Sequence, residues 1–191
     1  VLTRADSSGY VYGQDGITEA RWNYIMDIKN NKRGRISDYI KKYPKAEFKK
    51  NKTPWEVKCE IALPSATQNE LNGDDAKLLV KNGCICVAEG ANMPCNSDAI
   101  KTFKFNKVLF APGKASNAGG VAVSGLEMAQ NSLRYSWSRE EVDEKLKEIM
   151  IKIHKKCLKH GKTKDYIDYG KGANISAFIK VADAMLAQGV V

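Results

Sequence analysis

The chain has 191 residues, of which 43% are hydrophobic and 28% charged, and its formal net charge is +9. This length and composition are typical of a globular domain with a substantial core. They exclude a membrane-spanning protein, because no apolar run approaches the roughly 20 residues that a bilayer requires. The first residues lack the basic-then-apolar pattern of a signal peptide, which favours the cytoplasm.

The first two thirds of the chain alternate between strand and helix patterns. Residues 1–5 predict a strand that ends in a polar turn, and residues 18–31 predict a helix with Thr18 as N-cap, followed by a short helix after Gly34. Further strands are expected at 57–63, 84–88 and 108–110, separated by helices at 74–81 and near Ser97. This alternation predicts an α/β fold with a doubly wound, mostly parallel sheet.

The last third is predicted to be helical. One helix is expected at 115–135, and a second is opened by a capping box of Ser138 and Glu141. A third helix is expected to begin near Asn174. The second helix carries an apolar stripe at helical spacing, formed by Val142, Leu146, Ile149, Ile153 and Cys157.

Cysteine and histidine spacings indicate no metal site. The five cysteines are odd in number and irregularly spaced, which argues against a secreted disulfide framework and favours structural roles in or near the core. Cys84 and Cys86 have the wrong spacing for a zinc knuckle, and His154 and His160 do not share one helix face.

The positive charge raises the alternative of a basic binding module. Lysines concentrate at 41–52 and 145–164. Aromatic residues are sparse and no nucleic-acid-binding motif is present, so solvated helix faces and loops are the favoured interpretation. We therefore expect neither a nucleic-acid partner nor a membrane partner.

Ordered turn motifs follow the predicted strands. Residues 62–71 (ALPSATQNEL) and 88–94 (AEGANMP) each follow a strand, and 111–131 (APGKASNAGGVAVSGLEMAQN) run from a strand through a glycine-rich turn into a helix. Such turns lie at the carboxyl edge of a parallel sheet, where backbone approaches a ligand closely. Together with the tail at 172–189, these motifs resemble the hexameric Glu/Leu/Phe/Val dehydrogenase family over essentially the whole chain.

Within that family the resemblance is to the C-terminal portion of the NADP-dependent glutamate dehydrogenases. A dinucleotide fold normally opens with a central strand and a Gly-x-Gly-x-x-Gly fingerprint, and neither lies in these residues. We therefore expect an incomplete Rossmann-like domain at 1–114, followed by a hinge and C-terminal helices at 115–191. The resemblance implies a separate N-terminal domain, outside this chain, that carries the catalytic lysine and aspartate.

The opening strand ends where the adenosine ribose lies in a dinucleotide fold, at Asp6 and Ser7. A nearby cation accommodates the 2′-phosphate of NADP, whereas an acid alone favours NAD. The resemblance assigns Lys29, Lys32 and Arg35 to that phosphate. Ala5 departs from the serine that NADP-preferring relatives often carry, so NAD remains a weaker alternative.

The remaining site residues follow from the resemblance. It implies that Ala66, Thr67 and Gln68 contact the ribose region of the coenzyme. The turn of Gly90, Ala91 and Asn92 is expected near the nicotinamide ribose, and Asn117 is expected to bind the carboxamide. Val121 and Ser124 lie one helical turn apart and are expected to hold the methylene carbons and distal carboxylate of the substrate.

The function implied is the NADP(H)-dependent interconversion of L-glutamate with 2-oxoglutarate and ammonium, by a homohexamer. The chain alone is expected to be inactive, because no catalytic residue falls within it. Two alternatives remain at this stage: a dehydrogenase for another amino acid, and a basic binding module without catalysis.

Overall fold

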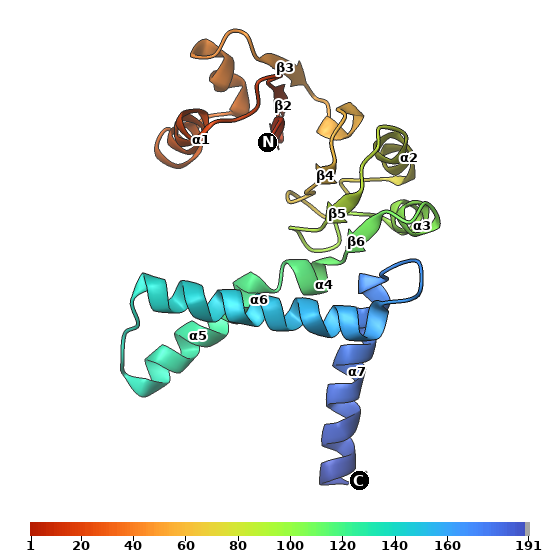
Figure 1. Cartoon of the computed structure of the whole chain (residues 1–191). Coiled ribbons are helices and arrows are strands. Elements are labelled where there is room, and N and C mark those ends of the chain that lie inside the picture. Colours follow the sequence, from red (N-terminus) through yellow and green to blue (C-terminus); the bar gives the residue numbers. More distant parts are fainter. Residues whose placement is uncertain (190–191) are drawn as a thin grey trace.

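The computed structural model describes residues 1–189. An N-terminal lobe, a middle layer with a parallel sheet and a helical C-terminal part follow one another along the molecule (Figure 1). Strands and helices are mixed as an α/β fold requires.

The N-terminal lobe is built on an antiparallel sheet of β1 (Thr3–Asp6), β2 (Gly9–Tyr12) and β3 (Glu47–Lys50), in that order. The expectation that the opening strand joins the parallel sheet is therefore wrong for the described chain. Asp6 pairs with Gly9, so a two-residue turn folds the chain back at once. Gly9 has a φ of +139°, and a Cβ there would collide with the Lys49 carbonyl, so glycine permits the pairing of β2 with β3.

Helical segments cover this small sheet. Thr18 caps α1 (Glu19–Met26), as expected, and the helix continues into a π-helical turn, η1 (Asp27–Asn31). A 3₁₀ helix, η2 (Ile36–Lys41), is the short helix predicted after Gly34. Together they enclose a core made of Val11, Ile25, Ile28, Ile36 and Tyr39.

The middle layer holds the parallel sheet, with β5 (Cys86–Ala88) between β4 (Ile61–Ala62) and β6 (Leu109–Ala111). The parallel sheet predicted from the sequence is confirmed here, although β4 is much shorter than the expected 57–63. In the described chain β4 is an edge strand, with β5 as its only neighbour.

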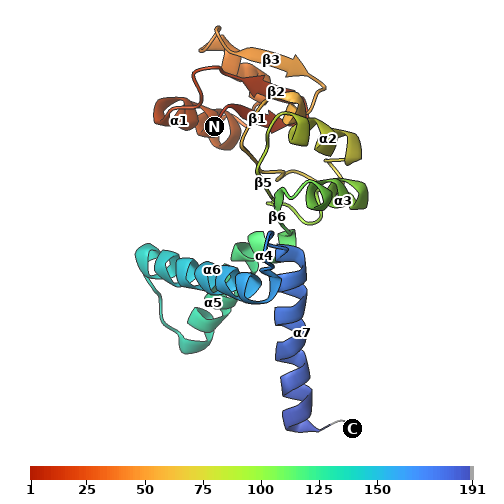
Figure 2. The ribbon, with the colours of Figure 1, turned by 45° about the vertical axis from the view of Figure 1, so that its right-hand side comes forward.

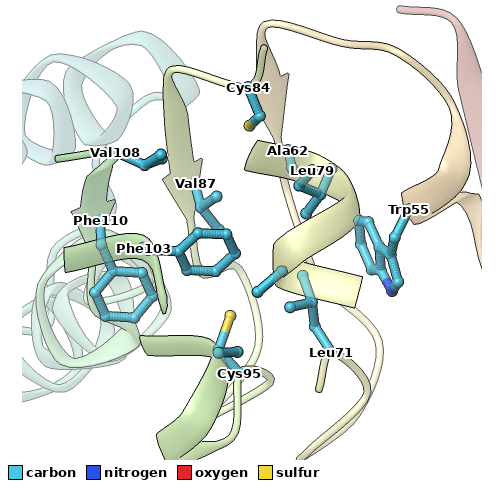
Figure 3. Close-up of a cluster of buried hydrophobic side chains, with 12 residues drawn as sticks. Trp55, Ala62, Leu71, Leu79, Cys84, Val87, Cys95, Phe103, Val108 and Phe110 are labelled. Atoms are coloured by element: carbon cyan, nitrogen blue, oxygen red, sulfur yellow. The ribbon is translucent and has the colours of Figure 1, made fainter. Parts of the chain in front are cut away.

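Two helices complete this layer, α2 (Gly73–Lys81) and α3 (Ser97–Phe105), which begin at the asparagine caps Asn72 and Asn96. Their buried side chains and those of the sheet form the larger core, in which the Phe103 and Phe110 rings stack with centroids 6.2 Å apart (Figure 3). The 3₁₀ turn η3 (Pro54–Glu56) adds Trp55 to this core.

The C-terminal part contains α4 (Gly113–Ser116), α5 (Gly119–Leu133), α6 (Arg139–Gly161) and α7 (Tyr169–Gln188). The single helix expected at 115–135 is divided in two, because α4 ends at its C-cap Asn117 and α5 begins only at Gly119. The capping box of Ser138 and Glu141 is confirmed. The last helix begins earlier than predicted, because Asp168 caps it by accepting from Lys171 N.

The start of α7 packs closely on α6. Gly161 and Gly172 are buried at the crossing, and a Cβ on Gly172 would collide with the Cys157 carbonyl. The far half of α7 extends away from the rest of the molecule (Figures 1 and 2) and exposes Phe178, Val181, Met185 and Leu186.

All five cysteines are free thiols, three buried and two half-buried, in agreement with structural roles. Over residues 1–189, none of the helices combines the length and the apolar character needed to cross a bilayer.

The α6–α7 crossing gives a stability prediction. Gly172→Ala should lower the free energy of unfolding by about 1–3 kcal/mol, because the added methyl group meets backbone that cannot yield. Gly125→Ala, in the middle of α5 with open space around it, should raise it by about 0.5–1 kcal/mol. Urea unfolding of both variants is the measurement. Equal changes in the free energy of unfolding for the two variants would contradict the close approach of α7 to α6 at Gly172.

Candidate functional site

Most of the predicted site residues occupy two places in the structure. One is the polar cluster at the end of β1, which contains Asp6, Ser7, Lys29 and Arg35. The other is the set of strand-end loops, residues 62–71, 88–95 and 111–117, which leave the carboxyl ends of β4, β5 and β6. Because these three strands are parallel, their loops emerge at one edge of the sheet.

Asp6 is the centre of the polar cluster. Its Oδ2 accepts from Lys29 Nζ at 2.8 Å and from Ile36 N at 2.9 Å, and its Oδ1 accepts from Ser8 N at 2.9 Å and from Ser8 Oγ at 2.6 Å. These bonds attach the π-helical turn and η2 to the end of β1. Asp6 therefore positions the backbone from which the neighbouring cations project.

Electrostatics agree with this structural role. Partial burial alone raises the pKa of Asp6, but hydrogen bonds from Lys29, Ser8 and Ile36 outweigh it and hold that pKa well below its usual range. The Asp6 side chain is only 13% exposed, whereas that of Lys29 is 36% exposed. Asp6 therefore remains ionised at neutral pH, and its charge balances that of Lys29.

The exposed side of this cluster carries donors. Arg35 Nη1 donates to Ser7 Oγ at 2.6 Å, and both residues are exposed. A guanidinium beside a hydroxyl suits a phosphate group, which takes two parallel hydrogen bonds from arginine. Four of the five predicted residues thus come together at the end of β1.

Lys32 lies apart from the other four. Its ammonium pairs with Asp27 Oδ2 at 2.6 Å and lies 5.6 Å from the centroid of the Tyr24 ring. The side chain is 62% exposed, so its position is fixed by one surface ion pair rather than by packing. Surface pairs of this kind contribute little to stability and are exchanged readily.

The strand-end loops are joined to one another by backbone hydrogen bonds. Asn69 N donates to Met93 O at 3.0 Å, and Gly90 N donates to Pro64 O at 2.8 Å. A Cβ on Gly90 would meet the Ser65 side chain, so glycine lets the two loops approach closely. Three predicted coenzyme contacts, Ala66, Thr67 and Gln68, lie exposed on the first of these loops.

Two predicted asparagines meet across the second and third loops. Asn117 Nδ2 donates to Asn92 Oδ1 at 2.7 Å. The remaining donors and acceptors of the two amides are free to hydrogen-bond a carboxamide or a ribose hydroxyl. Ala91 lies next to this pair and is half-buried.

Glu89 is a residue that the sequence interpretation missed. It is 4% exposed and lies beneath the loops, where its carboxylate accepts from Cys95 N at 3.2 Å and from Gly113 N at 2.6 Å. The sequence offered one signal, an acidic residue directly after a predicted strand. A carboxylate at such a position is expected to have a specific partner, because it is rarely buried without one.

Val121 and Ser124 lie on α5, away from the sheet. Val121 is 78% exposed and Ser124 is also exposed. Two surface hollows, of about 300 and 220 Å³, are lined by residues around 162–167 and around Arg4 and Trp22, and contain none of the predicted site residues. Within 1–189, no three His, Cys, Asp or Glu side chains gather as a metal site would require.

The Asp6 cluster gives a pH prediction. Asp6→Asn should lower the free energy of unfolding at pH 7 by about 1–3 kcal/mol, because charged hydrogen bonds are lost. The pKa of Asp6 is lower in the folded state than in the unfolded state. The ionised carboxylate therefore stabilises the fold above the unfolded-state pKa, and this stability is lost as the pH falls toward the folded-state pKa. The difference in the free energy of unfolding between wild type and Asp6→Asn should therefore become smaller from pH 7 to pH 3, as measured by urea titrations.

The control for that comparison is Asp74→Asn, which removes an exposed carboxylate at the start of α2 and should have a much smaller effect at pH 7. A gap for Asp6→Asn that stays constant over this pH range would contradict the role of its charge.

The chain matches the Glutamate/Leucine/Phenylalanine/Valine dehydrogenase family over residues 1–189. It is 58% identical to a glutamate dehydrogenase of Bacteroides thetaiotaomicron, over the whole chain and 43% of that relative. The crystal structure of Plasmodium falciparum glutamate dehydrogenase superposes with a TM-score of 0.92 at 50% identity, over the whole chain and 41% of that structure.

Coenzyme names differ among similar relatives. A protein of Haemophilus influenzae named NADP-specific glutamate dehydrogenase is 54% identical over the whole chain and 42% of its own length. One of Porphyromonas gingivalis named NAD-specific glutamate dehydrogenase is 51% identical over the whole chain and 43% of its own length. The chain thus spans less than half the length of the relatives it matches. With a family match that covers residues 1–189 and relatives that align along its full length, the chain belongs to the glutamate/leucine/phenylalanine/valine dehydrogenase family.

Proposed function

We propose that this chain is the coenzyme-binding part of a glutamate dehydrogenase. The reaction converts L-glutamate, water and oxidised coenzyme into 2-oxoglutarate, ammonium, reduced coenzyme and a proton, and runs in both directions. The observation that carries the proposal is the meeting of three strand-end loops at one sheet edge, with Asn92 and Asn117 hydrogen-bonded there. The identity to glutamate dehydrogenases along the whole chain supports the substrate.

The nicotinamide coenzyme accepts or supplies the hydride exchanged with the substrate α-carbon. In this proposal the chain orients that coenzyme. Ala66, Thr67 and Gln68 contact its ribose region, and Gly90 and Ala91 let the backbone approach closely. Asn92 lies by the nicotinamide ribose, and Asn117 holds the carboxamide.

NADP is the proposed coenzyme. Ser7 and Arg35 present a hydroxyl and a guanidinium side by side at the end of β1, and Lys29 adds positive charge behind them. Lys32 joins them when it exchanges its surface pair with Asp27 for the 2′-phosphate. NAD remains the competing coenzyme, since Asp6 supplies the acid typical of NAD sites.

The substrate pocket needs a second wall. Val121 and Ser124 are exposed on α5, so in this proposal they hold one end of the substrate while another domain encloses it. That domain supplies the catalytic lysine and aspartate, and cleft closure assembles the site. The boundary at residue 114, the C-terminal position of the chain, the homohexamer and the inactivity of the chain alone stay predictions from the family resemblance.

Two other functions are tested by simple measurements. A dehydrogenase for a branched-chain or aromatic amino acid would turn over those substrates faster than glutamate in a panel. A basic module would bind nucleic acid with an affinity that falls steeply with salt. Preference for glutamate and failure to bind nucleic acid are the expected results.

Substrate recognition is tested by Ser124→Ala in the complete enzyme. Loss of a hydrogen bond to a carboxylate costs about 1.5–3 kcal/mol, so kcat/KM for 2-oxoglutarate should fall about 10- to 150-fold. Ser132→Ala, a second exposed serine on α5, is the matched control and should change it less than about twofold. A wild-type value for Ser124→Ala would remove Ser124 from the substrate site.

Coenzyme choice is tested by Arg35→Ala in the complete enzyme. The substitution should lower kcat/KM for NADPH about 10-fold or more, because a charged contact to the 2′-phosphate is lost. The value for NADH should remain within about twofold. Lys41→Ala, which removes an exposed cation at the end of η2, should affect neither coenzyme. Equal losses with NADPH and NADH would show that Arg35 does not read the phosphate.

A further inference from the structure

Glu89 is the only charged side chain that is buried in the described part of the chain, at 4% exposure. No lysine, arginine or histidine of residues 1–189 forms an ion pair with it; its charge is met by backbone N–H groups instead. Burying a carboxylate is costly unless hydrogen bonds compensate for the lost water, so its retention here calls for a specific role.

The two carboxylate oxygens bind two different loops. Oε1 accepts from Cys95 N at 3.2 Å, at the end of the loop that carries Asn92. Oε2 accepts from Gly113 N at 2.6 Å, at the start of the turn that carries Asn117. Ser116 Oγ also donates to the Glu89 carbonyl at 2.6 Å. One residue therefore joins the two loops whose asparagines meet above it.

Gly113 transmits this arrangement. A Cβ built on Gly113 would lie 2.8 Å from Ala91 O, 3.4 Å from Asn117 Nδ2 and 3.4 Å from Glu89 Oε2. Gly113 O also accepts from Asn117 N at 2.9 Å, so the backbone held by the carboxylate is hydrogen-bonded to the residue that is proposed to bind the coenzyme. A shift of Gly113 would move Asn117 with it.

A carboxylate suits this position better than an amide. Both oxygens face N–H donors, so each must accept a hydrogen bond. A glutamine has one oxygen, which could accept from only one of the two backbone N–H groups. Its NH₂ group would face the other N–H, and these two facing donors would both lack an acceptor. Burial and the Glu89 carboxylate also raise the pKa of the Cys95 thiol, so that neighbour stays neutral.

We propose that Glu89 is a positioning residue for coenzyme binding: by accepting from Gly113 N and Cys95 N, it holds the Asn92–Asn117 pair where the coenzyme nicotinamide requires it. This inference rests on the proposed function, because the asparagine pair must be the coenzyme contact for Glu89 to act through it.

The test is Glu89→Gln in the complete enzyme, assayed with 2-oxoglutarate, ammonium and NADPH. The KM for NADPH should rise about 10-fold or more, which corresponds to about 1.4 kcal/mol, while the KM for 2-oxoglutarate stays within about twofold. A merely structural role would reduce the amount of folded enzyme, and so the apparent kcat, but would leave both KM values unchanged.

Asp168→Asn is the matched control. It also removes a partly buried carboxylate that accepts from a backbone N–H, at the start of α7, and that pairs with Lys104. This change should leave the KM for NADPH unchanged. If Glu89→Gln yields no folded enzyme, Glu89→Asp decides, because it keeps both acceptors at shorter reach and should raise the KM for NADPH in the same direction, by a smaller factor.

Two results would overturn the proposal: a folded variant with an unchanged KM for NADPH, or equal rises in the KM values of both substrates. Failure of the proposed function looks different. Wild-type enzyme that reduces neither NADP nor NAD with glutamate overturns that function, and this inference with it, before any variant is compared.

Discussion

The parallel alignment of β4, β5 and β6 determines where the strand-end loops of this protein meet, at the edge proposed to bind the coenzyme. Parallel strands deliver their carboxyl ends to the same edge, so three loops that are distant in sequence become neighbours. The core formed by the sheet, α2 and α3 fixes the strands (Figure 3). Backbone hydrogen bonds between the loops then fix the loops, as between Gly90 N and Pro64 O.

Two carboxylates serve the same purpose at the two ends of the proposed coenzyme site. Asp6 accepts from Ile36 N and holds the segment from which Arg35 projects. Glu89 accepts from Gly113 N and holds the turn from which Asn117 projects. In both places an acid with little exposure orders the backbone, and a polar side chain of that backbone is left for the ligand. Charged hydrogen bonds suit this role because they are stronger than neutral ones.

Local signals predicted much of the fold. The caps Thr18 and Ser138 marked helix starts correctly, and the alternation of patterns gave the parallel sheet. The hairpin of β1 and β2 was missed, because its turn at 7–8 contains neither asparagine nor glycine at the usual positions. The missed strand β3 is short and lies at a sheet edge, where its pairing depends on β2 rather than on its own sequence.

The site was predictable to a smaller extent. The order of the motifs along the chain predicted that Asn92 and Asn117 lie at the same edge of the parallel sheet. In the structure their side-chain amides are hydrogen-bonded to each other. Lys32 was grouped with Lys29 and Arg35 from the family resemblance, but its side chain pairs with Asp27 at the end of the π-helical turn. Glu89 acts through backbone atoms, and no sequence pattern shows which N–H groups a buried carboxylate will meet.

The exposure of Arg35 and Ser7 has a consequence for how this family diversifies. The groups that would distinguish one coenzyme from another lie on the surface, while the acid that orders them lies beneath. Surface substitutions usually change stability by less than about 0.5 kcal/mol. Coenzyme preference can therefore be exchanged during evolution without loss of the fold, and lineages can adapt it to the supply of each coenzyme.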